Sequence, residues 1–438
     1  MSLKKPDLHL LVLSVSAVVL FVLGGARVFR SSNDFIPVYT GARCLLHGCN
    51  PYDTSQLEQQ FFRAGGHATE LPSWDIDVPV YPPSTFLVLS PLALFPFPAA
   101  RLIWFLLNGS LFVAATGLIL ATCPPSHRWL ATALGSLFLL SSAILLVLGQ
   151  PAIFAISLLG IGICLFLRGL LLPLGTLLLI LSLAVKPQVG GLIVLYLVAR
   201  RLHWRSAAVA LAGALALLLA AALILQLHPR SAGWPSTLRQ NLTATLDTGG
   251  SADPRPANPQ AIGDTNLQSL TSIFFLSARK LNLAAYAVFI LLFAAFVLVF
   301  WGTNVDPELH LLAVAALSIL SLMPVYHRFY DTRLLLLTVP AAVIVFQKRR
   351  FLGAAIAVMT ALQVFSVQYR LQIFLIQHDE WKSVLQNKLL FILLLRQQNL
   401  ELLILFGLYL LATFSIRFSS SRAMDSYPVF EPATPLHQ

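Results

Sequence analysis

The sequence predicts an all-α polytopic membrane protein with about 12 transmembrane helices and a large first outer loop. Of its 438 residues, 57% are hydrophobic and only 11% are charged, whereas a typical soluble domain carries about 25% charged residues. Apolar stretches alternate with short polar ones along the chain, and about 20 apolar residues cross a bilayer once. This composition excludes a soluble enzyme and a disordered chain.

The net charge of +11 comes largely from short basic runs between apolar stretches. Such runs are typical of cytoplasmic loops under the positive-inside rule. We therefore interpret the basic balance as a signal of topology and expect no nucleic-acid partner. The densest runs are Lys4 with Lys5, Arg200 with Arg201 and Arg205, and Lys348 with Arg349 and Arg350.

The first span is expected at residues 8–29, starting inside and left uncleaved because it lacks a small-x-small site. It leads to a long outer loop, residues 30–83, which holds six of the 18 acidic residues. The following segment, 84–96, is too short to cross and is broken by Pro91. We expect it to be re-entrant or interfacial and shielded by protein.

The rest of the chain continues the same pattern, with outer turns at 149–151, 186–188 and 326–331 and a second outer loop at 228–283. Residues 370–398 mix charged and apolar residues as an amphipathic helix lying on the membrane would. The tail, 417–438, is predicted to be disordered and cytoplasmic. The remaining predicted spans are 99–121, 129–148, 152–167, 170–185, 188–199, 206–227, 284–302, 308–325, 332–346, 351–369 and 399–416.

Cysteine and metal-ligand patterns are sparse. Cys44 and Cys49 share the first outer loop and could pair if it faces an oxidising compartment. The alternative is two unpaired thiols in a partly buried loop. Asp75 and Asp77 match the letters of a D-x-D motif, which is a weak pattern, and HExxH, CxxC and Walker motifs do not occur. We expect no metal and no cofactor.

Two charged residues on the predicted outer face are the strongest candidates for chemistry. Asp34, four or five residues after the first span, could act as a general base that activates an acceptor hydroxyl, or it could cap the next helix over 34–46. Lys186 interrupts an apolar run, where an ionisable group is costly. Its ammonium could bind a lipid-linked phosphate, or its stem could snorkel to the interface.

Weaker candidates lie on the same face. His327 and Arg328 could both contact a phosphate or a sugar hydroxyl, or they could form a solvated turn. Gln150 follows Gly149 and either binds substrate or shapes a turn. Tyr39 and Tyr81 suit stacking on a sugar, but they equally suit the aromatic belt of the membrane interface.

Taken in order, short motifs over roughly residues 10–350 resemble those of glycosyltransferase family 87, the polyprenol-phosphate-mannose-dependent mannosyltransferases of the GT-C fold. Each motif is weak alone, and their order and spacing carry the resemblance. They are Asp34-Phe35, Tyr39, Leu45-Leu46-His47-Gly48, Asn50-Pro51-Tyr52-Asp53, Tyr81-Pro82-Pro83, Pro91-Leu92-Ala93-Leu94, Gly149-Gln150 and Ala184-Val185-Lys186-Pro187.

The resemblance implies a GT-C-like transmembrane glycosyltransferase domain over 1–416 in a bacterial inner membrane, with its active site facing the periplasm or exterior. It implies a polyprenyl-phosphate sugar donor, a glycolipid or glycan acceptor, and no required metal. In such enzymes an acid in the first outer loop is the proposed general base, which carries over to Asp34. His327 and Lys186 match positions near the donor phosphate.

Departures from the family pattern leave the acceptor and the sugar open. The later Asn-Gln-Ser-Leu-like segment is Asn266-Leu267-Gln268-Ser269-Leu270 here, and the turn at His327 lacks a Ser-Trp context. A transporter or flippase of a lipid-linked sugar is the alternative, although such proteins often contain repeats and none is evident. A non-catalytic scaffold that keeps the fold is a further alternative.

Overall fold

The computed structural model describes residues 7–29, 33–71, 78–258, 261, 263–301, 307–365, 371, 374–375, 377–378 and 387–425, with side chains up to residue 417. Within these ranges the regular elements are helices, together with one isolated β-bridge between Asp264 and Arg328. The predicted all-α class is confirmed for this part of the chain. Trp74, Asp75 and Asp77 lie outside the described residues.

The α-helices are named in chain order and are joined by short 3₁₀ helices. The 3₁₀ helices are η1 (Ala68–Glu70), η3 (Leu92–Leu94), η4 (Pro125–His127) and η6 (Asp331–Thr338). The α-helices are α1 (Leu8–Gly25), α2 (Phe35–His47), α3 (Thr54–Arg63), α4 (Pro83–Leu89), α5 (Phe97–Leu120), α6 (Arg128–Ser141), α7 (Ala143–Leu148), α8 (Pro151–Leu167), α9 (Leu172–Val185), α10 (Pro187–Ala199), α11 (Trp204–Leu227), α12 (Trp234–Leu246), α13 (Leu267–Thr271), α14 (Ala278–Phe300), α15 (Pro307–Ser321), α16 (Val339–Lys348), α17 (Arg350–Phe365), α20 (Lys388–Leu395) and α21 (Gln397–Asp425).

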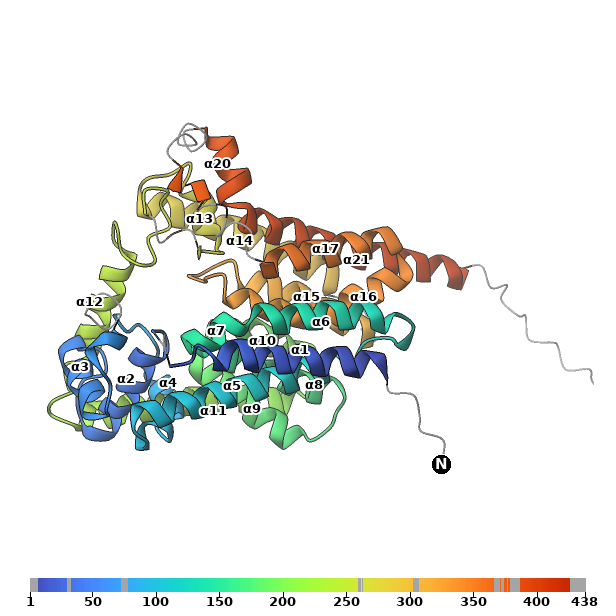
Figure 1. Ribbon diagram of the computed structural model, residues 1–438. Helices are drawn as coiled ribbons and strands as arrows, with labels where there is room; N and C mark the ends of the chain where they lie inside the picture. Colours follow the sequence, from blue (N-terminus) through green and yellow to red (C-terminus); the bar gives the residue numbers. More distant parts are fainter. Residues whose placement is uncertain are drawn as a thin grey trace, which may run out of the picture.

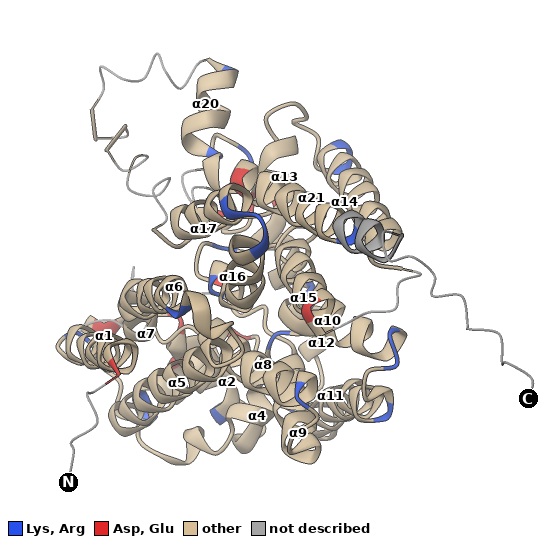
Figure 2. Ribbon diagram, turned by 90° about the vertical axis from the view of Figure 1, so that its right-hand side faces the viewer, with Lys and Arg blue, Asp and Glu red and all other residues tan. Residues whose placement is uncertain are grey.

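The long helices run side by side, and the short helices α2, α3, α4 and α12 gather at one end of the bundle, at the left of Figure 1. Seen along the bundle in Figure 2, helices α1, α5–α9 and α11 form one group, and α13–α17, α20 and α21 form another. Helix α10 packs against α15 and joins the two groups. Charged residues are sparse along the helices, as a membrane-embedded bundle requires.

Six helical stretches are long and apolar enough to cross a membrane, among the residues that the structure describes. They are Leu8–Gly25, Phe97–Leu120, Pro125–Leu148, Trp204–Leu227, Ala278–Phe300 and Gln397–Arg417. Five further apolar helices are shorter, and they coincide with predicted spans: Pro151–Leu167, Leu172–Val185, Pro187–Ala199, Pro307–Ser321 and Arg350–Phe365. The chain is thus an integral membrane protein, and the count of twelve spans stays a prediction.

One predicted span has a different local structure. The stretch expected at 332–346 begins as the 3₁₀ helix η6 and becomes α-helical only from Val339. Pro340 explains the change, because proline has no N–H to donate to the preceding turn and is tolerated only in the first turn of an α-helix.

The segment predicted to be the first outer loop, together with α4, η3 and the start of α5, forms a cap with its own hydrophobic core. Phe35 of α2 stacks on Trp104 of α5 with ring centroids 5.5 Å apart, and Phe61 of α3 packs edge-on against Phe97 at 4.8 Å. The predicted helix over 34–46 appears as α2, and it is buried on most sides rather than on one face. The segment expected to be re-entrant forms α4 and η3, which pack against protein.

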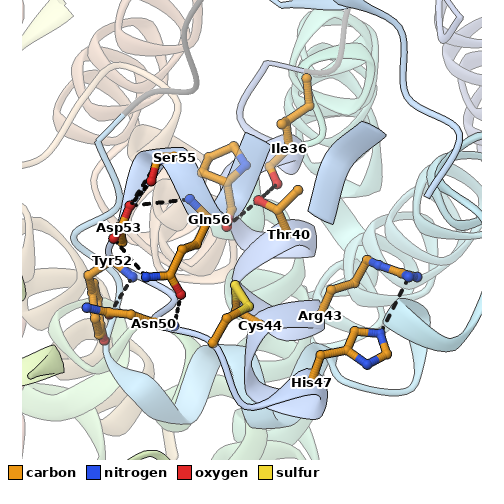
Figure 3. Close-up of a disulfide and its surroundings, with 12 residues drawn as sticks. Ile36, Thr40, Arg43, Cys44, His47, Asn50, Tyr52, Asp53, Ser55 and Gln56 are labelled. Carbon is orange, nitrogen blue, oxygen red and sulfur yellow. Dashed lines mark hydrogen bonds between the residues drawn. A yellow bond between two sulfur atoms is a disulfide. The ribbon is translucent and has the colours of Figure 1, made fainter. Parts of the chain in front are cut away.

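Cys44 and Cys49 form a disulfide at the end of α2 (Figure 3). Gly48 allows the reversal between them, because its φ of +70° lies in the left-handed region that glycine adopts without steric cost. Of the two alternatives for these thiols, the structure has the paired one. A disulfide in this cap fits an oxidising compartment outside the cytoplasm.

The C-terminal part differs from the prediction in two ways. Most of the predicted interfacial segment, 370–398, lies outside the described residues, but Arg396, which we expected on the surface, is buried. Its guanidinium donates hydrogen bonds to the carbonyls of Ala261 and Pro254, which pulls it inward. Helix α21 continues to Asp425, so the first residues of the predicted disordered tail are helical, and 426–438 lie outside the described residues.

Candidate functional site

Lys186 stands at a break between two membrane helices. It ends α9 and precedes α10, and its φ of −148° and ψ of 78° are non-helical because the following Pro187 disfavours the helical conformation. The break leaves helix carbonyls without partners inside the bundle. Two hydroxyls at the start of α4 act as hydrogen-bond donors to these carbonyls: Ser84 Oγ donates to Ala184 O at 2.6 Å, and Thr85 Oγ1 donates to Val185 O at 3.0 Å.

These two hydrogen bonds connect the segment that follows Tyr81-Pro82-Pro83 to the distant Lys186-Pro187 pair. Pro82 and Pro83 fix where α4 begins. The hydroxyls of the next two residues, Ser84 and Thr85, therefore face the last carbonyls of α9. The contacts stabilise the non-helical backbone at Lys186. The cap therefore supports the Lys186 site structurally.

Lys186 forms an ion pair with Asp331, which lies 145 residues further along the chain. The other carboxylate oxygen of Asp331 contacts Nδ1 of His327 at 3.0 Å. Asp331 and His327 are fully buried, and Lys186 is 9% exposed. Burial by itself would raise the pKa of Asp331, but Lys186 and His327 lower it to about 2. Asp331 is therefore an anion at neutral pH.

The charge on Asp331 determines the protonation of His327. A carboxylate only accepts hydrogen bonds, so Nδ1 of His327 must carry the proton in this contact. Nε2 of His327 is buried and has no hydrogen-bond partner among the described residues. The structure thus orients an imidazole with one nitrogen held by an acid and the other free for a ligand, the arrangement that acids commonly impose on functional histidines.

Asp34 lies at the start of α2, next to the turn at Gly149 and Gln150. Its backbone N–H donates to Leu148 O at 3.1 Å. Gly149 has a φ of +73°, and a Cβ placed on it would come within 2.6 Å of Cβ of Phe35, so only glycine fits this approach. The Asp34 side chain makes no capping hydrogen bond to α2, so the capping interpretation does not account for its carboxylate.

Arg328 links Asp34 to the turn that contains His327. Burial by itself would lower the pKa of Arg328, but its neighbours raise that pKa above its ordinary value. These neighbours come from three separate segments of the chain, so the fold brings the three segments together near Arg328. They are Tyr326, Tyr330, Asp264 and Asp34.

Tyr330 connects the remaining members of the site. Nζ of Lys186 lies 5.1 Å from the centre of its ring, a cation–π contact. Burial, followed by the charges of Tyr326, Asp331 and Asp34, raises the pKa of Tyr330. Tyr330 was not predicted from the sequence. The carboxylates of Asp331 and Asp34 act on it electrostatically, and the Lys186 ammonium contacts its ring.

The weaker sequence candidates have different surroundings. Gln150 is 2% exposed, and its Nε2 has no hydrogen-bond partner in the described part of the chain, which leaves it available to a ligand. Tyr39 is fully buried in the cap core, and its hydroxyl donates to Phe95 O at 2.7 Å. Tyr81 is half-buried beside the same core, and its carbonyl accepts from Tyr52. The structure gives these two tyrosines packing surroundings.

Asp264 is a buried acid that the sequence did not single out. It pairs with Arg328 in the isolated bridge, in which Phe329 N donates to Gly263 O at 2.8 Å and Thr265 N to His327 O at 2.9 Å. Both carboxylate oxygens of Asp264 are buried without a hydrogen-bond partner within the described ranges. Burial raises its pKa to about 7, against the opposing effect of Arg328 and Arg396.

Replacing Asp264 with Asn is expected to flatten the dependence of stability on pH. The folded protein holds the Asp264 proton up to about pH 7, whereas the unfolded chain releases it near pH 4. Stability contributed by the neutral acid is therefore lost as pH rises from about 4 to about 7, by about 3–4 kcal/mol at most. Thermal unfolding of both proteins between pH 5 and pH 8 measures this. An equal fall in melting temperature for both would contradict the prediction.

The site contains cationic and amide groups and no evident metal ligand set. No group of three or more His, Cys, Asp or Glu residues is placed to hold a metal ion among the described residues. The ammonium of Lys186, the imidazole of His327 and the guanidinium of Arg328 are groups that bind phosphate oxygens. The fold and this cluster define an integral membrane protein with a polar site at one end of a helical bundle.

The family model described as glycosyltransferase family 87 matches residues 80–325, which is more than half of the chain. The chain belongs to glycosyltransferase family 87, and it is a membrane glycosyltransferase. The match includes Tyr81, Gln150 and Lys186, whereas Asp34, His327 and Arg328 lie outside it. None of the curated proteins and none of the solved structures compared with the chain matches it.

Proposed function

We propose that this glycosyltransferase moves mannose from a polyprenyl-phosphate donor to an acceptor hydroxyl on a glycolipid or glycan. The reaction takes place at the outer face of a bacterial inner membrane, at the cluster of Lys186, Asp331 and His327 and the neighbouring Arg328, on which Asp34 acts electrostatically. One observation supports it above the others. The Lys186 ammonium, the Arg328 guanidinium and the His327 imidazole, from distant segments, lie in one electrostatic cluster that also includes the separate carboxylate of Asp34.

The proposed mechanism is a single displacement with inversion. The Asp34 carboxylate takes the proton of the acceptor hydroxyl, and the oxygen attacks the anomeric carbon from the face opposite the phosphate. The bond between this carbon and the phosphate oxygen breaks, and its electron pair leaves with the lipid phosphate. Lys186 and Arg328 stabilise the negative charge on the leaving phosphate, and His327 adds an Nε2–H donor to it when both of its ring nitrogens carry protons.

Product analysis tests the proposal. Purified protein in liposomes is supplied with β-linked polyprenyl-phosphate mannose and a mixture of membrane glycolipids, and the products are examined by mass spectrometry and NMR. The expected product is one hexose heavier than its acceptor and carries an α-linkage. A β-linked product would exclude a single displacement. Movement of the sugar across the bilayer without a new glycosidic bond would contradict the transferase proposal.

A further inference from the structure

A second polar site lies in the outer cap, away from the cluster around Lys186. It is a cleft of about 600 Å³ whose walls come from α2, α3 and the segment after α11. Four of its lining residues are basic, and the lining, which lies wholly in described ranges, contains no carboxylate. The basic residues are Arg43, His47, Arg63 and Arg230. Such a cleft has a positive potential that favours an anionic ligand.

The structure holds the wall of the cleft in place. Arg43 NH1 donates to Ala93 O at 2.9 Å, while its NH2 group lies 3.5 Å from Nε2 of His47. Figure 3 shows Arg43 and His47 side by side at the edge of α2, next to the disulfide. The disulfide and the left-handed Gly48 fix the end of this helix. Arg43 can only donate in this contact, so Nε2 of His47 accepts, and the guanidinium and the imidazole are held side by side at the edge of the cleft.

Amide groups complete the lining. Gln56 is fixed in position, because its Nε2 donates to Asp53 at 2.8 Å and its Oε1 accepts from Asn50 N at 2.9 Å. Gln59 and Gln60 line the cleft beside it. Amides both donate and accept hydrogen bonds, so they suit the hydroxyls of a glycerol or sugar next to a phosphate.

Exposed apolar residues adjoin the cleft residues along the chain, and they indicate the source of the anion. Leu46 and Phe62, the chain neighbours of His47 and Arg63, are 43% and 46% exposed. Leu94 is 74% exposed, next to Ala93 whose carbonyl binds Arg43. Exposed apolar residues around a basic site are the pattern of a membrane interface, where acyl chains lie beside a headgroup.

We propose that this cleft binds the phosphate-bearing headgroup of an anionic membrane lipid. The arginines contact the phosphate, the glutamines contact the adjoining hydroxyls, and the exposed apolar residues nearby in the chain, Leu46, Phe62 and Leu94, contact the first part of the acyl chains. The cleft is at the C-terminal end of α2, whereas Asp34 is at its N-terminal end. The site is thus distinct from the proposed transfer site and does not depend on the proposed function.

Direct lipid binding tests this inference without any transfer assay. Delipidated protein is titrated with phosphatidylglycerol, phosphatidylcholine or soluble sn-glycerol 3-phosphate, and binding is measured by native mass spectrometry. The wild type is expected to bind phosphatidylglycerol at least tenfold more tightly than phosphatidylcholine. The variant with Arg63→Gln and Arg230→Gln is expected to lose about tenfold or more of this affinity, since each charge-assisted hydrogen bond to phosphate contributes on that scale.

The matched control carries Arg279→Gln and Lys280→Gln at the exposed start of α14, which removes two positive charges outside the cleft. It is expected to bind phosphatidylglycerol like the wild type. The inference is overturned if the cleft variant binds unchanged, if the control loses as much affinity, or if the wild type does not discriminate between the two lipids. Equal affinity for glycerol phosphate would overturn the lipid assignment and identify a site for soluble phosphates.

Discussion

Replacing Asp34 with Asn is expected to lower the rate of sugar transfer by about 10²–10⁴-fold, which is the usual contribution of a positioned general base. The amide keeps the size of the side chain but cannot accept the acceptor's proton. Because the charge of Asp34 acts on Arg328 and Tyr330, its loss also alters the electrostatic potential of the site. The rate is measured as labelled mannose transferred from the donor in reconstituted liposomes.

Asp53→Asn provides a matched control in the same outer segment. Asp53 caps α3 by accepting from Ser55 N at 3.0 Å and Gln56 N at 3.3 Å, and Asn is also a good capping residue. This variant is expected to keep its transfer activity. If Asp34→Asn transfers sugar at the wild-type rate while folded normally, Asp34 is not the base.

The second large effect is expected at the buried ion pair. Asp331→Asn leaves the Lys186 ammonium buried without its counter-charge, and breaking such a pair costs about 3–5 kcal/mol. The same change removes the anion that holds the proton on Nδ1 of His327, so the imidazole loses its fixed orientation. We expect both a lower melting temperature and a loss of transfer.

A double-mutant cycle separates these two roles. Lys186→Met combined with Asp331→Leu removes both charges, so its stability should exceed that predicted from the sum of the single variants. Its transfer activity should stay low, because the phosphate-binding ammonium is absent. Additive losses of stability would show that the pair is not coupled, and recovered transfer in the double variant would remove Lys186 from the mechanism.

The pH dependence of the pair follows from the lowered pKa of Asp331. Its pKa is about 2 in the folded protein and about 4 in the unfolded chain. The stability that it contributes is therefore complete above about pH 4 and is lost as pH falls towards 2. Between pH 5 and pH 8 Asp331 stays ionised, so the difference expected there between the wild type and Asp264→Asn does not come from this pair.

Much of the helical architecture could be predicted from the sequence, because length, apolarity and proline act locally. The apolar stretches beginning near Leu8, Phe97 and Trp204 each became one long helix. Pro187 ended one helix and started the next. In the predicted span 332–346, the apolar run favoured an α-helix but Pro340 is tolerated only in a first turn. The α-helix therefore begins at Val339 rather than at 332.

The candidate site was predictable only in part. Lys186 could be singled out because a charge in an apolar run is rare and costly, and its partner Asp331 was visible only as one polar residue of an outer turn. Asp264 and Tyr330 gave no such signal, since their burial arises from the docking of the 261–271 segment against the 326–331 turn. Tyr39 looked like a sugar-stacking residue, and the cap core that encloses it could not be foreseen.

The sequence by itself determined that this chain is a helical membrane protein of family 87, because hydropathy and ordered motifs are properties of consecutive residues. The tertiary structure decided which charges meet. Asp331 is 145 residues from Lys186, and Arg328 is influenced by Asp34 and Asp264 from separate segments. Electrostatic coupling and desolvation depend on distance and burial in space, so only the folded chain decides which of these groups act on one another.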